Sequence, residues 1–234
     1  MNRLGFCSNM AAMWIIVPVK GFAEGKRRLT HVLAPRQRRA LCRAMAEDVF
    51  ATVSRVPGLA GVAVVTGDPE VATLATGYGF RLIDDVRPRG ETAAVETAMA
   101  RLASDGATAC AVVPGDVPLA TTAEIAAALE GHGAGPAVTL VPSRDGRGTN
   151  LVAMSPVAAI QLRFGDDSFP YHTAAARQLG VEPRILRLAG LGLDIDTGPD
   201  LQELISAGIG TRAWECLSAI DLDPVAVPAV EARP

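Results

Sequence analysis

The sequence predicts an α/β fold with a mainly parallel sheet covered by helices on both faces. Two observations support this. Segments with strand character alternate with segments of helical periodicity, and the early strands are continuous apolar runs such as WIIVPV (14–19) and GVAVVT (61–66). Continuous apolar strands are buried on both faces, which is typical of parallel sheets flanked by helices. Because ligands bind beyond the carboxyl ends of such strands, the residues that follow each strand are candidates for a site.

The first half of the chain supplies four strands and two helices. After the strand at 14–19, Leu41, Met45 and Val49 recur at helical spacing and predict an amphipathic helix over 35–53. The strand at 61–66 is broken by Gly67-Asp68-Pro69, and a shorter strand follows at 80–83. An alanine-rich helix over 91–103 leads to the apolar strand ACAVV at 109–113.

The second half continues the alternation. Thr121 and Glu124 have the spacing of a capping box and predict a helix that runs to Leu129. Pro199 is typical of a first helical turn and predicts a helix over 199–206. Apolar runs predict strands at 136–141, 150–154, 184–188 and 191–195, with a helix at 168–179. We expect a loose N-terminal extension over 1–13, one domain over 14–220, and a flexible tail rich in Pro, Ala and Val over 221–234.

Composition excludes several classes of protein. The chain has 234 residues with 49% hydrophobic and 20% charged residues, as expected for a globular protein with a sizeable core. Its formal net charge of −3 gives no basic footprint for nucleic acid. No apolar run approaches the roughly 20 residues of a membrane span, and the N-terminus lacks the pattern of a signal peptide. The cysteines have no paired spacing, so reduced thiols and a cytoplasmic location are expected; they are Cys7, Cys42, Cys110 and Cys216. The histidines are likewise isolated, at His31, His132 and His172.

Three carboxylates lie near the ends of two expected strands. Asp116 follows the strand at 109–113, and Asp194 and Asp196 alternate with apolar residues in LGLDIDTGPD. Alternation places Asp194 and Asp196 on one face, roughly 6–7 Å apart, where like charges favour protonation unless a cation lies between them. The alternative is that one Asp ends the strand and Thr197 begins the next helix, which leaves Asp194 unexplained. An all-oxygen set suits Mg²⁺ bound together with phosphates.

Basic and glycine-rich loops supply candidate anion sites. The loop PVKGFAEGKRRL after the first strand carries Lys20, Lys26 and Arg28, which suit a polyphosphate, although a solvated basic loop is the alternative. This loop matches neither the P-loop nor the dinucleotide-binding pattern. In DGRGTN, Thr149 could bind an anion, or the segment could be a plain hairpin turn. In RFGDDSFPYH, a helix start near Ser168 could bind an anion, or Asp167 or Ser168 could simply cap the helix.

Five of these segments, in order, resemble one enzyme family. VPVKGFAEGKRRL, GDVPL, GRGTN, FGDDSFPYH and LDIDTGPDL are similar to segments of the guanylyltransferases of coenzyme F-420 biosynthesis, which use 2-phospholactate, phosphoenolpyruvate or 3-phosphoglycerate. The resemblance spans roughly 14–204. It implies a Rossmann-like nucleotidyltransferase (GT-A-like) fold, a three-layer α/β/α sandwich with a mainly parallel sheet.

The resemblance also implies a reaction. A phosphate oxygen of the acid attacks the α-phosphorus of GTP and pyrophosphate leaves, and no general base is needed because the nucleophile is already an anion. It implies that Mg²⁺ is bound by Asp116, Asp194 and Asp196. It implies that the acid is bound by Lys20, Thr149, Gly165 and Ser168, and the nucleotide by Lys26, Arg28 and Gly90. It implies catalytic roles for Asp116, Lys20, Lys26 and Arg28.

One segment departs from the family. Glu91 and Thr92 follow Gly90 where the family shows a small or apolar residue and then Asn, so the preference for guanine is less secure than the chemistry. A GC-rich composition argues against a methanogen, and the acid expected is 3-phosphoglycerate slightly ahead of phosphoenolpyruvate. We expect GTP and a small phosphorylated carboxylic acid as partners, no nucleic acid and no membrane, with a homodimer as an option.

Other functions stay open. They are a sugar or molybdopterin nucleotidyltransferase, a DxD glycosyltransferase, and a non-catalytic nucleotide-binding protein. The first strand is not followed by an L-x-G-G-x-S-x-R-M loop, which argues against the sugar and molybdopterin nucleotidyltransferases. The three carboxylates together argue against a non-catalytic nucleotide-binding protein.

Overall fold

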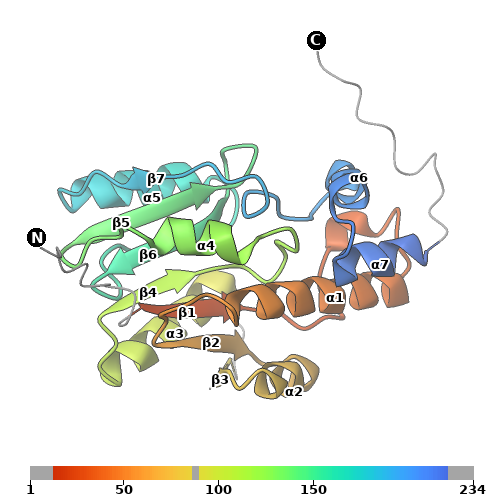
Figure 1. Cartoon of the computed structure of the whole chain (residues 1–234), viewed down its shortest axis with the longest axis horizontal. Coiled ribbons are helices and arrows are strands. Elements are labelled where there is room, and N and C mark those ends of the chain that lie inside the picture. Colours follow the sequence, from red (N-terminus) through yellow and green to blue (C-terminus); the bar gives the residue numbers. More distant parts are fainter. Residues whose placement is uncertain (1–12, 86–89, 221–234) are drawn as a thin grey trace, which may run out of the picture.

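A seven-stranded sheet forms the centre of the protein, shown in Figure 1 as a computed structural model that describes residues 13–85 and 90–220. The strand order is β3-β2-β1-β4-β6-β5-β7. β6 is antiparallel to both of its neighbours, β4 and β5, and all other pairs are parallel, so the predicted mainly parallel sheet is confirmed. The strands are β1 (Met13–Pro18), β2 (Gly61–Thr66), β3 (Arg81–Asp84), β4 (Ala109–Val112), β5 (Ala137–Pro142), β6 (Thr149–Ser155) and β7 (Arg184–Ile185).

Helices cover both faces of the sheet. Figure 1 shows α1 (Pro35–Val53) and α4 (Thr122–Leu129) in front of it and α3 (Glu91–Ser104) behind it. Phe50 of α1, Ile125 of α4 and residues of α2 (Pro69–Gly77) share one apolar cluster with the sheet. Val95 of α3 and residues of α5 (Ser168–Gln178) pack against the opposite face. The three-layer α/β/α arrangement is therefore the one expected from the sequence.

A third apolar cluster lies beyond the carboxyl end of the sheet. Here α6 (Gly198–Ala207) and α7 (Arg212–Ser218) pack with α1 and the 3₁₀ turn Arg27–Leu29 around Ile195, which is fully buried. Asp48 of α1 accepts hydrogen bonds from the backbone N–H groups of Arg212 and Ala213, at 2.9 and 2.8 Å, and so caps α7. This cluster fixes the segment that carries Asp194 and Asp196.

The structure corrects several expected elements. The segment 191–195 is not a strand: its backbone is held by isolated bonds, such as Ile195 N–H to the Asp116 carbonyl at 3.1 Å. β7 is shorter than the expected strand at 184–188. Two helices were not predicted. α2 begins where Asp68 accepts from the N–H groups of Glu70 and Val71, so the Gly-Asp-Pro break is also a helix start, and α7 depends on Asp48 from a distant helix.

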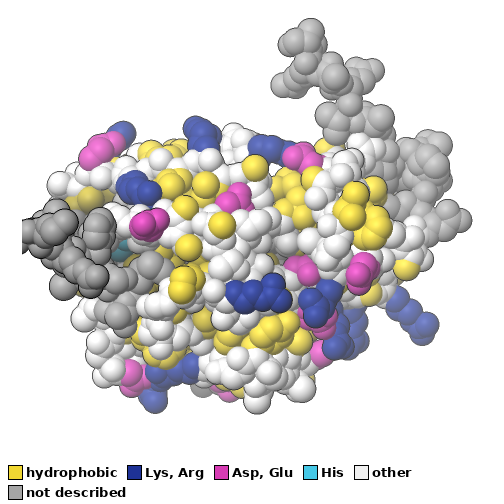
Figure 2. Space-filling model, viewed as in Figure 1, with side chains coloured by type: hydrophobic (Ala, Val, Ile, Leu, Met, Phe, Trp, Pro, Cys, Tyr) yellow, Lys and Arg dark blue, Asp and Glu magenta, His cyan; other side chains and the backbone are white. Residues whose placement is uncertain are grey.

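Three further expectations concern membrane spans, surface charge and the two ends of the chain. Among the helices in the described part of the chain, none is both long and apolar enough to cross a membrane. On the face shown in Figure 2, basic and acidic side chains are interspersed. The proposed extension and tail fall almost wholly outside the described residues, apart from Met13, which begins β1.

Candidate active site

Two chambers of about 690 Å³ each lie at the carboxyl end of the sheet. The first, here the Lys20 chamber, is formed by the loops after β1, β2 and β4 and the start of α3. The second, here the Ser168 chamber, is formed by the β5–β6 hairpin, the loop before α5 and the segment 193–200. The two chambers share four of their lining residues, which are Glu91, Pro114, Asp116 and Asp196. The two chambers therefore meet at three acidic residues, two of which, Asp116 and Asp196, are predicted metal ligands.

Lys26 bridges Asp116 and Asp196. Its Nζ donates to Asp116 Oδ2 at 2.6 Å and to Asp196 Oδ1 at 2.7 Å, and its side chain is only 6% exposed. Burial alone would lower the pKa of Lys26, but Asp116 and Asp196 outweigh burial, so the pKa is raised and the ammonium stays charged. Burial would raise the pKa of Asp196, but the positive charges nearby, above all Lys26, outweigh burial and hold the pKa of Asp196 below its usual value. The backbone of Lys26 is left-handed, at φ 54°, which marks a constrained position.

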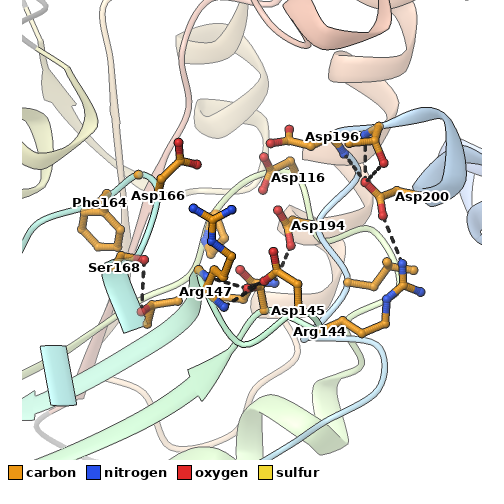
Figure 3. A pocket seen from close by; sticks show the side chains of 18 of the residues that line it. Asp116, Arg144, Asp145, Arg147, Phe164, Asp166, Ser168, Asp194, Asp196 and Asp200 are labelled. Atoms are coloured by element: carbon orange, nitrogen blue, oxygen red, sulfur yellow. Dashed lines mark hydrogen bonds and ion pairs between the residues drawn. The ribbon is translucent and has the colours of Figure 1, made fainter. Parts of the chain in front are cut away.

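Asp194, the third predicted metal ligand, lines the Ser168 chamber, as Figure 3 shows. The Asn150 side-chain amide donates to Asp194 Oδ1 at 3.1 Å. Burial, followed by the nearby charge of Asp116, raises the pKa of Asp194. Close packing positions this segment: a side chain at Gly190 would collide with the Leu119 carbonyl, so only glycine lets the chain pass there. The sequence was right to bring the three carboxylates to one site, although their segment is not a strand.

The carboxylates of this site suit Mg²⁺ by their chemistry and not by their present arrangement. As the side chains lie, no group of three or more Asp, Glu, His or Cys within residues 13–85 and 90–220 is arranged as a metal site. Lys26 takes the position between Asp116 and Asp196. Asp116 Oδ1, however, is buried and has no hydrogen-bond partner. Asp194 and Asp196 line the same chamber, and carboxylate oxygens suit a hard cation. The metal role of Asp116, Asp194 and Asp196 stays a prediction.

The Ser168 chamber has a wall of buried hydroxyls. Ser168 is 2% and Thr149 6% exposed, and Ser168 Oγ donates to Thr149 Oγ1 at 3.3 Å (Figure 3). DGRGTN is indeed a hairpin turn, between β5 and β6, yet Thr149 lines the chamber. Gly165, in the loop before α5, has φ 113°, which favours glycine. Asp167 occupies the N-cap position of α5 without capping by its side chain, because its carboxylate accepts from Arg147 Nε at 2.9 Å.

Arginines supply the positive charge of the Ser168 chamber. Arg28 lies 3.7 Å from Asp196 and 3.6 Å from Asp166, Arg144 binds Asp200 and Glu203, and Arg147 binds Asp167. Arg144, Arg147 and Asn150 were not predicted as site residues from the sequence. Their signal was present, because all three lie in or beside the DGRGTN motif.

Lys20 and Arg28 lie in the chambers opposite to those that the resemblance implies. Lys20 and Gly90 line the Lys20 chamber, whereas Arg28 lines the Ser168 chamber with Thr149, Gly165 and Ser168. Lys20 lies 4.0 Å from Glu91, and burial together with Asp116 raises the pKa of Glu91 to about 7. Of the two residues that depart from the family, Glu91 lines both chambers, and Thr92 accepts a hydrogen bond at 3.0 Å from the N–H of Phe164, which lines the Ser168 chamber.

The family model described as "Guanylyl transferase CofC like" matches residues 13–231. The chain belongs to this CofC-like guanylyltransferase family. A phosphoenolpyruvate guanylyltransferase of Conexibacter woesei is 36% identical to this CofC-like protein over 85% of the chain and 91% of the relative. A 2-phospho-L-lactate guanylyltransferase of Methanothermobacter thermautotrophicus is 34% identical over 86% of the chain and 88% of the relative. The family resemblance seen in the motifs is thereby confirmed.

Solved structures place the fold of the CofC-like protein among nucleotidyltransferases. A protein of Desulfovibrio desulfuricans described as a nucleotide-diphospho-sugar transferase has a TM-score of 0.72 at 19% identity and covers 89% of the chain and 95% of its own. A nucleotidyl transferase of Methanothermobacter has a TM-score of 0.61 at 17% identity over 84% of the chain and 96% of its own. At these identities the likeness concerns the fold, and it agrees with the GT-A-like sandwich expected from the sequence.

Proposed function

We propose that this protein is a Mg²⁺-dependent guanylyltransferase that transfers GMP from GTP to the phosphate of a phosphorylated three-carbon acid in coenzyme F-420 biosynthesis. The observation that carries the proposal is the meeting of two chambers at Asp116 and Asp196. A reaction between two substrates needs adjacent pockets whose contents touch at one point, and that point here carries the candidate catalytic charges.

The two chambers suit different ligands. The Lys20 chamber has apolar walls, including Phe22, Val65 and Met45, next to Lys20 and Lys26, which suits a base at one end and phosphates at the other. The Ser168 chamber has buried hydroxyls and three arginines, which suit a small molecule with a phosphate and a carboxylate. We therefore assign GTP to the Lys20 chamber and the acid to the Ser168 chamber.

The reaction transfers a nucleotidyl group. A phosphate oxygen of the acid forms a bond to the α-phosphorus of GTP, the bond from that phosphorus to the bridging oxygen breaks, and pyrophosphate leaves with the electron pair. Lys26 stays charged and neutralises phosphate oxygens at the junction of the chambers, while Thr149, Ser168 and Arg28 orient the acid. Mg²⁺, held by Asp116, Asp194 and Asp196, would supply further charge neutralisation on the triphosphate.

The acid and the base are narrower proposals. Relatives at 36% and 37% identity are named for phosphoenolpyruvate, which supports phosphoenolpyruvate as the first acid to test. The expectation from the sequence, 3-phosphoglycerate, stays a prediction beside it. At Glu91 and Thr92 this chain departs from the family pattern, so GTP has to be tested against the other nucleoside triphosphates. Membership of the family argues against the sugar and molybdopterin alternatives.

Pyrophosphate release tests the proposal. Each nucleoside triphosphate is paired with phosphoenolpyruvate, 3-phosphoglycerate, 2-phospholactate and a sugar phosphate, with and without Mg²⁺. Release with GTP and one three-carbon acid, abolished by a chelator, is the expected result. Release only with a sugar phosphate, or with no acid at all, would contradict the proposal. Mass spectrometry of the product identifies the new phosphoanhydride (P–O–P) bond between GMP and the phosphate of the acid.

A further inference from the structure

A buried histidine lies directly behind the hydroxyl wall of the Ser168 chamber. His172 is on α5, one turn after Ser168, and its side chain is completely buried. Its Nδ1 lies 3.0 Å from Thr149 Oγ1, and its Nε2 lies 3.0 Å from the backbone nitrogen of Arg163. The mechanism proposed above makes no use of His172. Its two contacts nevertheless connect the backbone of the loop before α5 to a hydroxyl of the acid chamber.

The contacts fix the tautomer of the ring. A backbone N–H is always a donor, so the Arg163 N–H requires an unprotonated Nε2 as its acceptor. Burial, followed by the charge of Arg163, lowers the pKa of His172 to about 4, so the ring is neutral near pH 7 and carries one proton. That proton is therefore on Nδ1, and Nδ1–H donates to Thr149 Oγ1.

The fixed tautomer determines what Thr149 and Ser168 can offer. The oxygen of a hydroxyl accepts two hydrogen bonds and donates one. Thr149 Oγ1 accepts from His172 and bonds with Ser168 Oγ, which uses one of the two hydroxyl hydrogens. The other hydroxyl hydrogen is left for a ligand in the chamber, which both residues line. Whichever hydroxyl supplies it, the pair presents a donor.

We propose that His172 is a positioning residue: by donating to Thr149 it leaves one hydroxyl hydrogen of the Thr149–Ser168 pair free to donate to a phosphate or carboxylate oxygen of the acid. The inference rests on the proposed function in one respect, the assignment of the acid to the Ser168 chamber. It adds a residue that acts on the acid through Thr149.

The surroundings of His172 hold the ring in place. Phe164 and Tyr171 both pack edge-on to it, with ring centroids 5.5 and 5.9 Å away. The Arg163 guanidinium stacks on Tyr171 at 4.3 Å, and the Phe164 N–H is bound to Thr92. A flip of the imidazole would put a ring carbon against the Arg163 N–H and leave that donor unpaired in the interior, which is costly.

His132 provides a matched control. It is 6% exposed, and burial lowers its pKa to about 4 as well. Both of its ring nitrogens also have partners, in this case two hydroxyls, Thr139 Oγ1 at 2.9 Å and Ser155 Oγ at 3.1 Å. His132 lines neither chamber. Removing either ring should cost similar packing and hydrogen bonding, but only His172 should affect binding of the acid.

The experiment compares His172→Leu, His172→Asn, His172→Gln and His132→Leu. In initial-rate measurements, His172→Leu should raise the KM for phosphoenolpyruvate about ten- to a hundredfold and leave the KM for GTP nearly unchanged. Asn can place an N–H donor near the position of Nδ1 and should recover most of the loss, whereas Gln places its amide near Nε2 and should not. His132→Leu should leave both KM values near those of the wild type.

Two further readouts separate this inference from the proposed function. Nitrogen-15 NMR of the histidine side chains should show His172 as the neutral Nδ1–H tautomer, and a proton on Nε2 would overturn the inference. Calorimetry with phosphoenolpyruvate, or with inorganic phosphate if no acid is turned over, should show weaker binding to His172→Leu than to His132→Leu. Equal binding by these two variants, or equal effects of His172→Leu on both KM values, would also overturn it. Absence of turnover by the wild type with every acid would instead count against the proposed function alone.

Discussion

The Lys26 ammonium lies 2.7 Å from the Asp196 carboxylate, although the two residues are 170 positions apart in the chain. Lys26 belongs to the loop after β1, and Asp196 to the segment that α6, α7 and α1 hold beyond the end of the sheet. A second bond, to Asp116 after β4, makes Lys26 the link between three loops. The charged junction between the two chambers is thus assembled from three segments that are far apart in the chain.

Replacing Lys26 should expose the repulsion within this junction. In Lys26→Met, Asp116 and Asp196 face each other without a cation, so metal-free stability should fall by ~1–3 kcal/mol, less than for a fully buried pair because both carboxylates are over 30% exposed. Mg²⁺ should restore part of the loss. Urea unfolding in chelator and in Mg²⁺ measures both effects, with Lys20→Met, exposed on the same loop, as the control. Equal stability of Lys26→Met and wild type in chelator would contradict this expectation.

Neutralising a carboxylate should act on catalysis more than on folding. Asp116→Asn and Asp196→Asn each remove a charge from the point where the chambers meet. We expect turnover at saturating Mg²⁺ to fall by about 10²–10³, the usual cost of removing one electrostatic contact to a transition state. Circular dichroism checks that the variants are folded, and pyrophosphate release gives the rate. Near-normal turnover in either variant would show that the metal assignment is wrong.

The sequence predicts the fold best where local periodicity and burial coincide. Leu41, Met45 and Val49 define α1 at its observed bounds, because helical spacing and the buried face agree there. It fails at 191–195, because alternating apolar and acidic residues report which side is buried and not whether the backbone joins a ladder. The role of His172 lay beyond the sequence, since only the fold brings Thr149 and Arg163 to the two nitrogens of its ring.

The side of the site on which a loop residue lies was also beyond the sequence. Lys20 and Arg28 are close in one loop, yet they line different chambers because the 3₁₀ turn Arg27–Leu29 redirects the chain between them. Asp116, Asp194 and Asp196 were gathered correctly because each follows or ends an apolar run near the carboxyl edge of the sheet. The ends of apolar runs are therefore a better guide to the presence of a site than to its internal arrangement.

The cysteines should be dispensable for catalysis, although bound GTP should slow the alkylation of one of them. Cys42 lines the Lys20 chamber, and burial raises its pKa to about 11, so it should react slowly near pH 7. Replacing all four cysteines with Ser or Ala should leave specific activity largely unchanged. Alkylation with iodoacetamide at raised pH, mapped by peptide mass spectrometry, should modify Cys42 more slowly when GTP is present. Loss of activity in the cysteine-free variant would reveal a role for a thiol.

Buried histidines should make the protein less stable in mild acid. The pKa values of His132 and His172 fall to about 4 from an ordinary value of 6.5, so between these values the unfolded chain binds protons that the folded chain does not. Stability is then full above pH 6.5 and falls as the pH decreases toward 4, by at most about 3 kcal/mol for each ring. Urea unfolding at pH 7 and 5 measures the decrease, which should be smaller in His132→Leu and His172→Leu. Unchanged pH dependence in both variants would assign the decrease to other groups.

Single substitutions should separate the two chambers kinetically. Ser168 lies in the wall of the Ser168 chamber, where its hydroxyl can serve the anionic acid, and Lys20 lies in the other chamber, where a triphosphate would be bound. A hydrogen bond to a charged group is worth roughly 1.5–3 kcal/mol, about ten- to a hundredfold in binding. Ser168→Ala should therefore raise the KM for the acid by about that factor with little change for GTP, and Lys20→Ala should do the reverse.

Arg28 distinguishes the resemblance from the geometry. The resemblance implies that Arg28 binds the triphosphate, whereas its side chain lines the Ser168 chamber and lies near Asp166 and Asp196. From the geometry we expect Arg28→Ala to raise the KM for the acid more than the KM for GTP. Initial rates with each substrate varied at saturating partner decide the matter, and Arg36→Ala, on the exposed start of α1, is the control. A selective rise in the KM for GTP would return Arg28 to the nucleotide and mean that its side chain turns across the junction when GTP binds.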